Sequence, residues 1–199
     1  MRTRLSTEQR REQLLAIGAE LFSNRPYDEV WIEEVAEIAG VSRGLLYHYF
    51  PTKRDFFAGI VRSARDRLLA MSTPDPALPV LAQLRYGLDV YLAYAQENPA
   101  GYRVVHRAAD AADPSIREIR DVGLAANRDR IIAGLGRIMP IGDTTRLAVR
   151  SWLTFVTAVV LDWLDNPSVS RDEIRDLCTR TLVAAVGPEL AEALEVAGE

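Results

Sequence analysis

The chain has 199 residues, of which 48% are hydrophobic and 26% charged, so it is long enough to bury a proper core. Its longest uncharged apolar stretch, residues 151–161, is about half of the roughly 20 residues that a membrane span needs, and its polar N-terminus lacks the apolar middle of a signal peptide. We therefore expect a cytoplasmic protein with no membrane partner. The single cysteine, Cys178, excludes an intrachain disulfide and favours a core or interface position over a reactive thiol.

The net charge of -4 argues at first against a nucleic-acid partner, but the charge is unevenly distributed. Residues 1–71 hold 11 basic and 10 acidic side chains, whereas residues 72–199 hold 13 and 18. The basic side chains of the first part gather at the start of the chain and again near residue 50: Arg2, Arg4, Arg10, Arg11, then Arg43, His48, Lys53 and Arg54. Because phosphates meet local patches rather than the total charge, DNA binding stays possible.

Apolar residues recur with helical spacing along the whole chain, and neither sustained two-residue alternation nor an Asn-Gly or Asp-Gly turn is present, so we predict an all-α fold. A first helix is expected over residues 7–24. A short second helix stops at Gly40, which tolerates a positive φ. Ser42 caps a third helix, and Thr52 with Asp55 has the spacing of a capping box that opens a fourth.

Three prolines between residues 74 and 79 cannot continue a helix, so we expect a first domain of residues 1–73 and a second of residues 74–199. Asp75-Pro76 and Asp113-Pro114 have the pattern of helix starts. They predict helices near residues 77–97, 99–109, 114–138 and 144–165. A capping box at Ser170 opens a last main helix, which ends at Gly187. The expected architecture is an N-terminal bundle of three or four helices plus a larger C-terminal helical domain.

The segment from Val35 to Phe50 consists of two short helices that meet at Gly40. At 100° per residue, Leu46 and Phe50 point together into the bundle, and the opposite, exposed side carries Arg43, Gly44, Tyr47 and His48. Arg43 can donate paired hydrogen bonds to the acceptors of guanine or to a phosphate, and Gly44 allows the backbone to approach DNA closely. The Tyr47 ring can contact a thymine methyl or donate to a phosphate. This face has the chemistry of a DNA reader.

Ile38-Ala39-Gly40-Val41-Ser42 joined to Gly44-Leu45-Leu46-Tyr47-His48-Tyr49-Phe50 strongly resembles the signature of the TetR family, and specific similarity spans residues 10–57. The resemblance implies an N-terminal helix-turn-helix domain and a larger C-terminal domain for ligand binding and dimerisation. It also implies a dimeric transcriptional repressor, bound to a palindromic double-stranded DNA operator and released by a small-molecule inducer. No cofactor is expected. The candidate DNA-binding residues are Trp31, Ser42, Arg43, Gly44, Leu45, Tyr47, His48, Tyr49, Thr52 and Lys53. Within this set, the resemblance implies that Arg43, Gly44 and Leu45 select the sequence.

Trp31 departs from the family pattern, which usually places Ser or Thr before the second helix. One interpretation is that Asp28 caps the helix one turn early. Another is that the indole N–H replaces the hydroxyl as a phosphate donor. The third is that Trp31 simply packs on the first helix.

The last two main helices are expected to form the dimer, because the stretch from Trp152 to Leu164 is apolar on nearly every side. The candidate interface residues are Trp152, Val156, Val159, Val160, Trp163, Ile174, Leu177, Cys178, Thr181 and Leu182. An apolar, aromatic or otherwise planar inducer is expected among the C-terminal helices. Its candidate lining residues are Tyr91, Tyr94, Tyr102, Trp152 and Phe155, although ordinary core packing explains each of them as well.

Other functional classes find little support in the sequence. With two histidines and one cysteine we expect no transition-metal site, and His106 fits a packed or exposed side chain. Glu33, Glu34 and Glu37 fit a solvated helix face. A Gly-rich phosphate loop and a Gly-x-Ser-x-Gly motif are lacking, so an enzyme is not expected. The second class to weigh is a helical interaction protein that has lost DNA binding, which a salt-dependent DNA-binding assay would separate from a regulator.

Overall fold

The computed structural model describes residues 5–108 and 114–197 of the chain. All regular structure in these ranges is helical and none of it is strand, which confirms the all-α prediction. Arg2 and Arg4 of the N-terminal basic cluster and the capping residue Asp113 lie outside the described residues.

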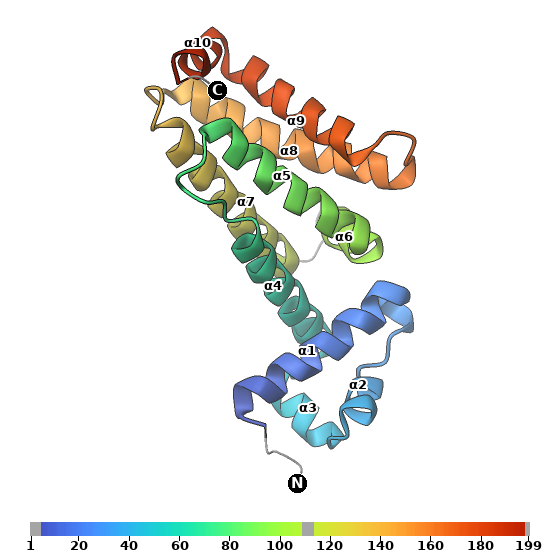
Figure 1. The fold of residues 1–199 in the computed structure, drawn as a ribbon. Helices are drawn as coiled ribbons and strands as arrows, with labels where there is room; N and C mark the ends of the chain where they lie inside the picture. The colour runs from blue at the N-terminus through green and yellow to red at the C-terminus, as the bar shows by residue number, and fades with distance from the viewer. Residues whose placement is uncertain (1–4, 109–113, 198–199) are drawn as a thin grey trace. The chain divides into compact units, whose positions relative to one another are not determined.

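The described chain consists of ten α-helices and one short 3₁₀ helix (Figure 1). Their bounds are α1 Thr7–Asn24, η1 Tyr27–Glu29, α2 Ile32–Ala39, α3 Arg43–Tyr49, α4 Lys53–Met71, α5 Val80–Glu97, α6 Pro99–Ala108, α7 Pro114–Leu135, α8 Asp143–Asp165, α9 Arg171–Val186 and α10 Pro188–Ala197. The sequence predicted nine of the α-helices and missed α10. Gly187-Pro188 ends α9 as expected, but the proline also starts α10, because proline is suited to the first position of a helix.

The helix ends follow capping chemistry. Ser6 and Ser170 each form a complete capping box, with Gln9 and Glu173 as the reciprocal partners. The helix expected from residue 77 begins instead at Val80, because the proline segment before it closes a turn in which Leu78 N donates to Asp75 O. The helix expected to run to residue 138 stops at Leu135 and is followed by tighter backbone turns.

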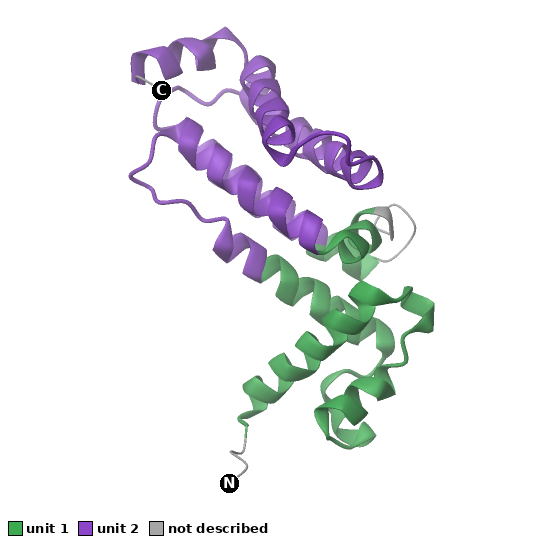
Figure 2. Cartoon of the chain, turned by 45° about the vertical axis from the view of Figure 1, so that its right-hand side comes forward, with its two compact units in different colours: residues 1–66, 98–119 green, residues 67–97, 120–199 purple. Residues whose placement is uncertain are grey.

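The chain divides by packing into two compact units (Figure 2). Unit 1 comprises residues 1–66 and 98–119, and unit 2 comprises residues 67–97 and 120–199. α4 and α7 each have one end in unit 1 and the other in unit 2. The domain boundary at residue 73 stays a prediction, because spatial packing does not show which segment folds by itself.

The core of unit 1 is built on aromatic rings from α1, from α4 and from Phe50, the C-cap residue of α3. The Phe22 ring lies 5.0 Å from that of Phe57, and the Phe50 ring lies 4.9 Å from that of Phe56, both edge-on. α1 and α4 approach closely at Gly18: a Cβ at this position would lie 2.8 Å from Ile60 Cδ1 and closer still to the Phe56 ring. Unit 1 therefore depends on a glycine in α1.

Gly18→Ala should lower the free energy of unfolding by about 1–3 kcal/mol, because overpacking forces buried rings away from their preferred rotamers. For a chain of this length, the midpoint of thermal unfolding should fall by roughly 2–4 °C per kcal/mol. Gly101→Ala in α6 is the matched control, since a Cβ there would meet nothing within 4 Å. A thermal melt in which both variants match the wild type would show that α1 and α4 are not tightly packed.

Unit 2 is organised by the packing of α5, α8 and α9. The Trp152 indole N–H donates to Cys178 O at 2.8 Å, which ties α8 to α9 inside the core. Burial raises the pKa of the Cys178 thiol to about 11, so the thiolate is scarce at neutral pH. Cys178 is a core residue, one of the two positions expected for it.

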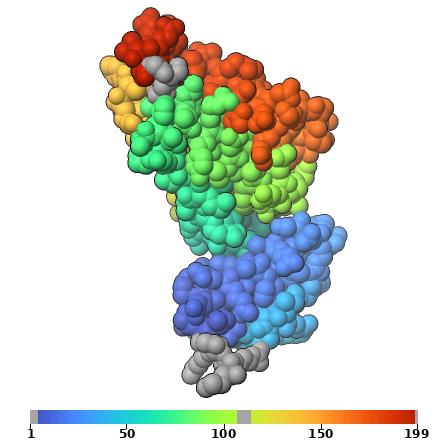
Figure 3. Space-filling model, viewed as in Figure 1, coloured from blue at the N-terminus to red at the C-terminus, as the bar shows by residue number. Residues whose placement is uncertain are grey.

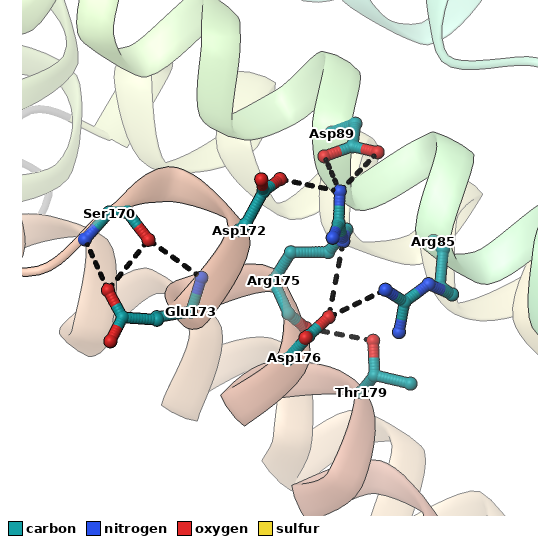
Figure 4. A network of polar contacts seen from close by, with 8 residues as sticks. All are labelled: Arg85, Asp89, Ser170, Asp172, Glu173, Arg175, Asp176 and Thr179. Atoms are coloured by element: carbon teal, nitrogen blue, oxygen red, sulfur yellow. Dashed lines mark hydrogen bonds and ion pairs between the residues drawn. The ribbon is translucent and has the colours of Figure 1, made fainter.

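An ion-pair network joins α5 to α9 on the same unit (Figure 4). Arg175 lies within 3.3 Å of carboxylate oxygens of Asp89, Asp172 and Asp176, and Arg85 pairs with Asp176 at 2.7 Å. Arg175 is only 17% exposed, so screening by water is weaker than for the usual surface pair. The network fixes the register between α5 and α9.

α8 is the one helix among the described residues whose length and apolar composition would allow it to cross a membrane. Only 28% of its most apolar 18-residue window is buried. Trp152, Val156, Val160 and Trp163 face inward, and the other side of the helix stays accessible. α8 is therefore an apolar helix with one side uncovered.

Candidate nucleic-acid interface and ligand cavity

The turn between α2 and α3 is set by two residues. Gly40 has φ 65°, in the left-handed region, and its N–H and that of Val41 donate back to the last carbonyls of α2. Two residues later, the Ser42 hydroxyl accepts a hydrogen bond from Leu45 N at 3.2 Å and starts α3. Together they place two short helices at a sharp turn, the geometry of a helix-turn-helix.

α3 has one buried and one exposed side, as the sequence predicted. Leu46 and Phe50 are 0% and 3% exposed. The exposed side carries Arg43, Gly44, Tyr47 and His48, with Leu45 and Tyr49 half-buried at its edges. A Cβ on Gly44 would meet nothing within 4 Å. The protomer thus has no packing need for a glycine at this exposed position.

Acidic side chains of α2 engage several of the exposed polar groups. Tyr47 Oη donates to Glu33 Oε1 at 2.6 Å, and Arg43 lies 3.5 Å from Glu37. The hydrogen bond from Tyr47 lowers the pKa of the Glu33 carboxyl and raises the pKa of Tyr47. The expectation of a purely solvated acidic face holds for Glu37 but not for Glu33 or Glu34, which are half-buried; Glu34 pairs with Arg25 at 2.6 Å.

Lys53 and Tyr49 are held beside the helix-turn-helix. Lys53 Nζ lies 3.4 Å from Asp28 O and 4.6 Å from the centre of the Tyr27 ring, so it is placed by a cation–π contact. Tyr49 Oη donates to Thr7 O at 3.3 Å. Thr52 caps α4 by accepting from Asp55 N at 3.0 Å. Ser42 and Thr52 therefore have structural roles at helix starts as well as exposed positions.

Trp31 occupies the N-cap position of α2 and forms no side-chain cap bond there. It is 69% exposed, so the interpretation in which Trp31 packs on α1 is wrong. Asp28 belongs to the separate turn η1, and α2 begins without the earlier cap proposed for it. The indole is left on the surface of unit 1.

A cavity of about 130 Å³ lies within unit 2, between the end of α4 and helices α5, α7, α8, α9 and α10. Two of the five candidate ligand residues, Tyr91 and Trp152, line it. Tyr94 and Phe155 belong to the same unit but are not lining residues. Tyr102 lies in unit 1, where its ring packs 4.2 Å from that of His106. The five residues are not brought together.

The sequence did not single out five polar or charged residues of this cavity: Ser72, Gln83, Asn127, Arg130 and Thr157. Asn127 and Arg130 lie on α7. Arg130 follows Arg128 and Asp129, a run of charges that is typical of a solvated face. The available signal was helical spacing: Asn127, Arg130 and Ile131 recur three and four residues apart after Leu124, which puts them on one face. Most other lining residues are apolar.

Most of the predicted interface residues are buried inside the protomer. They are Trp152, Val156, Val160, Trp163, Ile174, Cys178 and Leu182. These seven pack within unit 2 and expose little surface, so other side chains must supply most of any interface, and their assignment to it stays a prediction. Val159 and Thr181 are half-buried and Leu177 is exposed. Leu177 and Thr181 lie on the accessible side of α9, together with Ala184.

Two sequence profiles of known families match the chain. Residues 14–60 match bacterial regulatory proteins of the tetR family, and residues 80–185 match the tetracyclin repressor-like C-terminal domain. The second match alone covers more than half of the 199 residues. The chain belongs to the TetR family. This confirms the resemblance drawn from the residues around Gly40, and it makes the chain a DNA-binding regulator of transcription of the helix-turn-helix class.

Individual relatives of the chain carry different names. A tetR-family transcriptional regulator from Streptomyces coelicolor is 27% identical, with 96% of this chain and 90% of that chain covered and a TM-score of 0.85. The transcriptional activator FasR of Mycolicibacterium smegmatis is 27% identical over 65% of this chain and 68% of its own length. The nucleoid occlusion factor SlmA of Vibrio cholerae is 29% identical over 48% of this chain, and the match spans half of SlmA.

Proposed function

We propose that this TetR-family protein is a dimeric repressor that reads a palindromic operator with α3 and leaves it when a small molecule binds in unit 2. The observation that carries the proposal is the exposed face of α3, where polar and aromatic side chains surround Gly44. On the opposite side of the helix, Leu46 and Phe50 are buried in the core of unit 1. Such a helix can enter the major groove and present side chains to base edges. A protein with this role acts where the chromosome lies, in the cytoplasm.

The exposed residues divide into base readers and phosphate contacts. The guanidinium of Arg43, at the start of α3, presents paired N–H donors that match the acceptors of guanine. Because Gly44 has no side chain, the backbone there can approach the DNA closely. Leu45 adds an apolar contact beside them. The phosphate contacts come from side chains around the rim of the helix-turn-helix, which fix its register on the duplex. They are Trp31, Ser42, Tyr47, His48, Tyr49, Thr52 and Lys53.

Dimerisation is proposed through the accessible side of α8 and α9. On α8 an exposed stripe runs through Leu147, Ser151, Thr154 and Ala158, and on α9 a second stripe runs through Leu177, Thr181 and Ala184. The space-filling view shows α9, in orange-red, along the surface of unit 2 (Figure 3). Small and apolar side chains in such stripes let helices of two protomers approach closely and form a four-helix interface. A second copy of the chain would thereby cover the apolar side of α8.

The repressor role is distinguished from activation by a transcription assay. An operator overlapping a promoter should give less transcript as the protein is added, because a bound dimer excludes polymerase. The relative FasR is named a transcriptional activator, so an increase in transcript is the alternative outcome. An increase in transcript from the same template would contradict repression and leave the DNA-reading role intact.

Release from DNA by a ligand requires that the ligand binds two conformations of the protein with different affinities. A hundredfold loss of operator affinity corresponds to about 2.7 kcal/mol of preference for the form that does not bind DNA. The cavity in unit 2, lined by Tyr91, Trp152 and aliphatic side chains, is the proposed place for that ligand. Apolar walls with a few polar groups bind small molecules by burial and orient them by hydrogen bonds.

Replacing Glu33 with Gln should strengthen binding to all DNA sequences by a few-fold. The carboxylate lies 2.6 Å from Tyr47 Oη on the proposed DNA-facing side, and removing its charge removes repulsion from phosphates. Glu20→Gln on α1 is the control for a general charge effect. Fluorescence anisotropy with operator and random duplexes measures both. Weaker binding by the Glu33 variant would show that the carboxylate serves DNA binding by orienting Tyr47.

A further inference from the structure

Arg130 places a guanidinium at the wall of the apolar cavity in unit 2. It is the one charged side chain among the described residues that line the cavity. Arg130 lies on α7 and is half-buried, and burial lowers its pKa. A cation in such surroundings is costly unless its hydrogen bonds are made.

The observed partners of Arg130 are neutral oxygens. Nη1 donates to Ser72 O at 2.7 Å and to Ser72 Oγ at 3.1 Å, and Nη2 donates to Leu69 O at 3.1 Å. Among the residues that the structure describes, no carboxylate lies within ion-pair distance of this guanidinium. Arg128, two residues earlier, pairs at 2.8 Å with Asp129. Arg130 therefore brings a positive charge to the cavity that the described side chains do not neutralise.

Asn127 lies one turn before Arg130 on the same face of α7 and also lines the cavity. Its side-chain amide can donate a hydrogen bond beside the guanidinium. Most of the remaining wall is apolar and includes Leu84, Leu88, Trp152 and Val156. The cavity thus has a mostly apolar wall and one cationic group, and its other polar side chains, Ser72, Gln83, Tyr91 and Thr157, are neutral.

We propose that the cavity binds an apolar molecule carrying a single carboxylate, with the carboxylate held by Arg130 and Asn127. This inference rests on the proposed ligand-responsive function and names the class of its ligand. A carboxylate matches the planar fork of a guanidinium and can accept two parallel hydrogen bonds from it. One negative charge balances one guanidinium.

Other head groups fit the site less well. An amine would place a second positive charge beside Arg130, without a described carboxylate to offset it. A phosphate carries more negative charge than one guanidinium neutralises, and its excess would be buried against apolar walls. An alcohol can accept from the guanidinium but leaves its charge uncompensated. The volume of about 130 Å³ is close to the roughly 150 Å³ of an engineered cavity that holds benzene, so one aromatic ring suits the apolar part.

Three ligands that differ only in head group test the proposal: phenylacetate, 2-phenylethanol and 2-phenylethylamine. Calorimetric titration of the wild-type protein should give phenylacetate an affinity at least about tenfold above that of the alcohol, which corresponds to about 1.4 kcal/mol. The amine should bind more weakly than the alcohol. Equal affinities for acid and alcohol, or no binding of phenylacetate at millimolar concentration, would overturn the proposal.

Arg130→Gln should abolish the preference for the acid while changing the affinity for the alcohol less than about twofold. Arg128→Gln is the matched control on the same helix and should keep the preference. Arg130→Lys retains the positive charge but lacks the paired N–H donors of the guanidinium, so it should keep only part of the preference for the acid. This variant gives a second test if the Gln variant folds poorly. A preference that survives in Arg130→Gln would assign the carboxylate to another group.

Operator affinity measured with the same ligands separates this proposal from the function on which it rests. Arg130-dependent binding of phenylacetate that leaves operator affinity unchanged supports the carboxylate site and contradicts release by ligand. Loss of operator affinity with the alcohol and not with the acid supports ligand release and overturns the carboxylate site.

Discussion

The double substitution Ala158→Glu and Leu177→Glu should make the protein monomeric at micromolar concentration. It should also lower the affinity for the operator by about 100-fold or more. Both side chains are exposed, one on each stripe of α8 and α9. A symmetric dimer would bury four new carboxylates in an apolar interface without partners, at a cost of several kcal/mol each. A monomer contacts only one half-site and loses the advantage of linked binding.

Analytical ultracentrifugation measures the change in mass, and circular dichroism checks that the helices persist. Val122→Glu is the matched control, because Val122 is an exposed valine on α7, away from both stripes. Leu182 is unsuitable as a test position despite its place in the predicted interface: it is 1% exposed, so a charge there would unfold the core. A double variant that stays dimeric would place the interface on another surface.

Arg43→Ala and Lys53→Ala should weaken DNA binding in different ways. Removal of the Arg43 fork should cost about 1–3 kcal/mol at one operator base pair and relax the preference there, with little effect on random DNA. Removal of the Lys53 ammonium should weaken operator and random DNA alike. It should also lower the slope of log affinity against log salt by about one.

Anisotropy titrations over a range of salt concentrations, with operator and random duplexes, measure both effects. Arg137→Ala is the control for loss of a positive charge: Arg137 is an exposed arginine of unit 2, and its removal should change neither quantity. Equal losses on operator and random DNA for Arg43→Ala would contradict the division between base readers and phosphate contacts.

Local chemistry made the DNA-binding half predictable. Gly40 and Ser42 fix a turn through φ preference and capping, and these effects act within a few residues. The inward direction of Leu46 and Phe50 follows from helical periodicity alone. The hydrogen bonds of the exposed residues are harder to predict from the sequence. The one between Glu33 and Tyr47 joins residues fourteen positions apart, on two helices.

The interface and the cavity were predicted less well because both depend on which helix covers which face. Apolar spacing on α8 and α9 shows that several sides are apolar, but it does not show that Leu182 faces the core and Leu177 faces outward. Tyr102 was grouped with Tyr91 by residue type, although the two lie in different units. Helical spacing puts Arg130 on one face with Asn127 and Ile131, but it does not show that long-range packing makes this face the wall of a cavity.

Selection of bound duplexes from random DNA tests the central claim most directly, because it requires sequence reading and dimerisation together. The account predicts an enriched inverted repeat whose half-sites are centred about one helical turn, roughly 34–36 Å, or a simple multiple of it apart. Arg43→Ala should enrich a repeat with relaxed preference at the same position in both halves. Recovery of sequences without a common motif, or of a single unrepeated half-site, would contradict a dimer that reads DNA with α3.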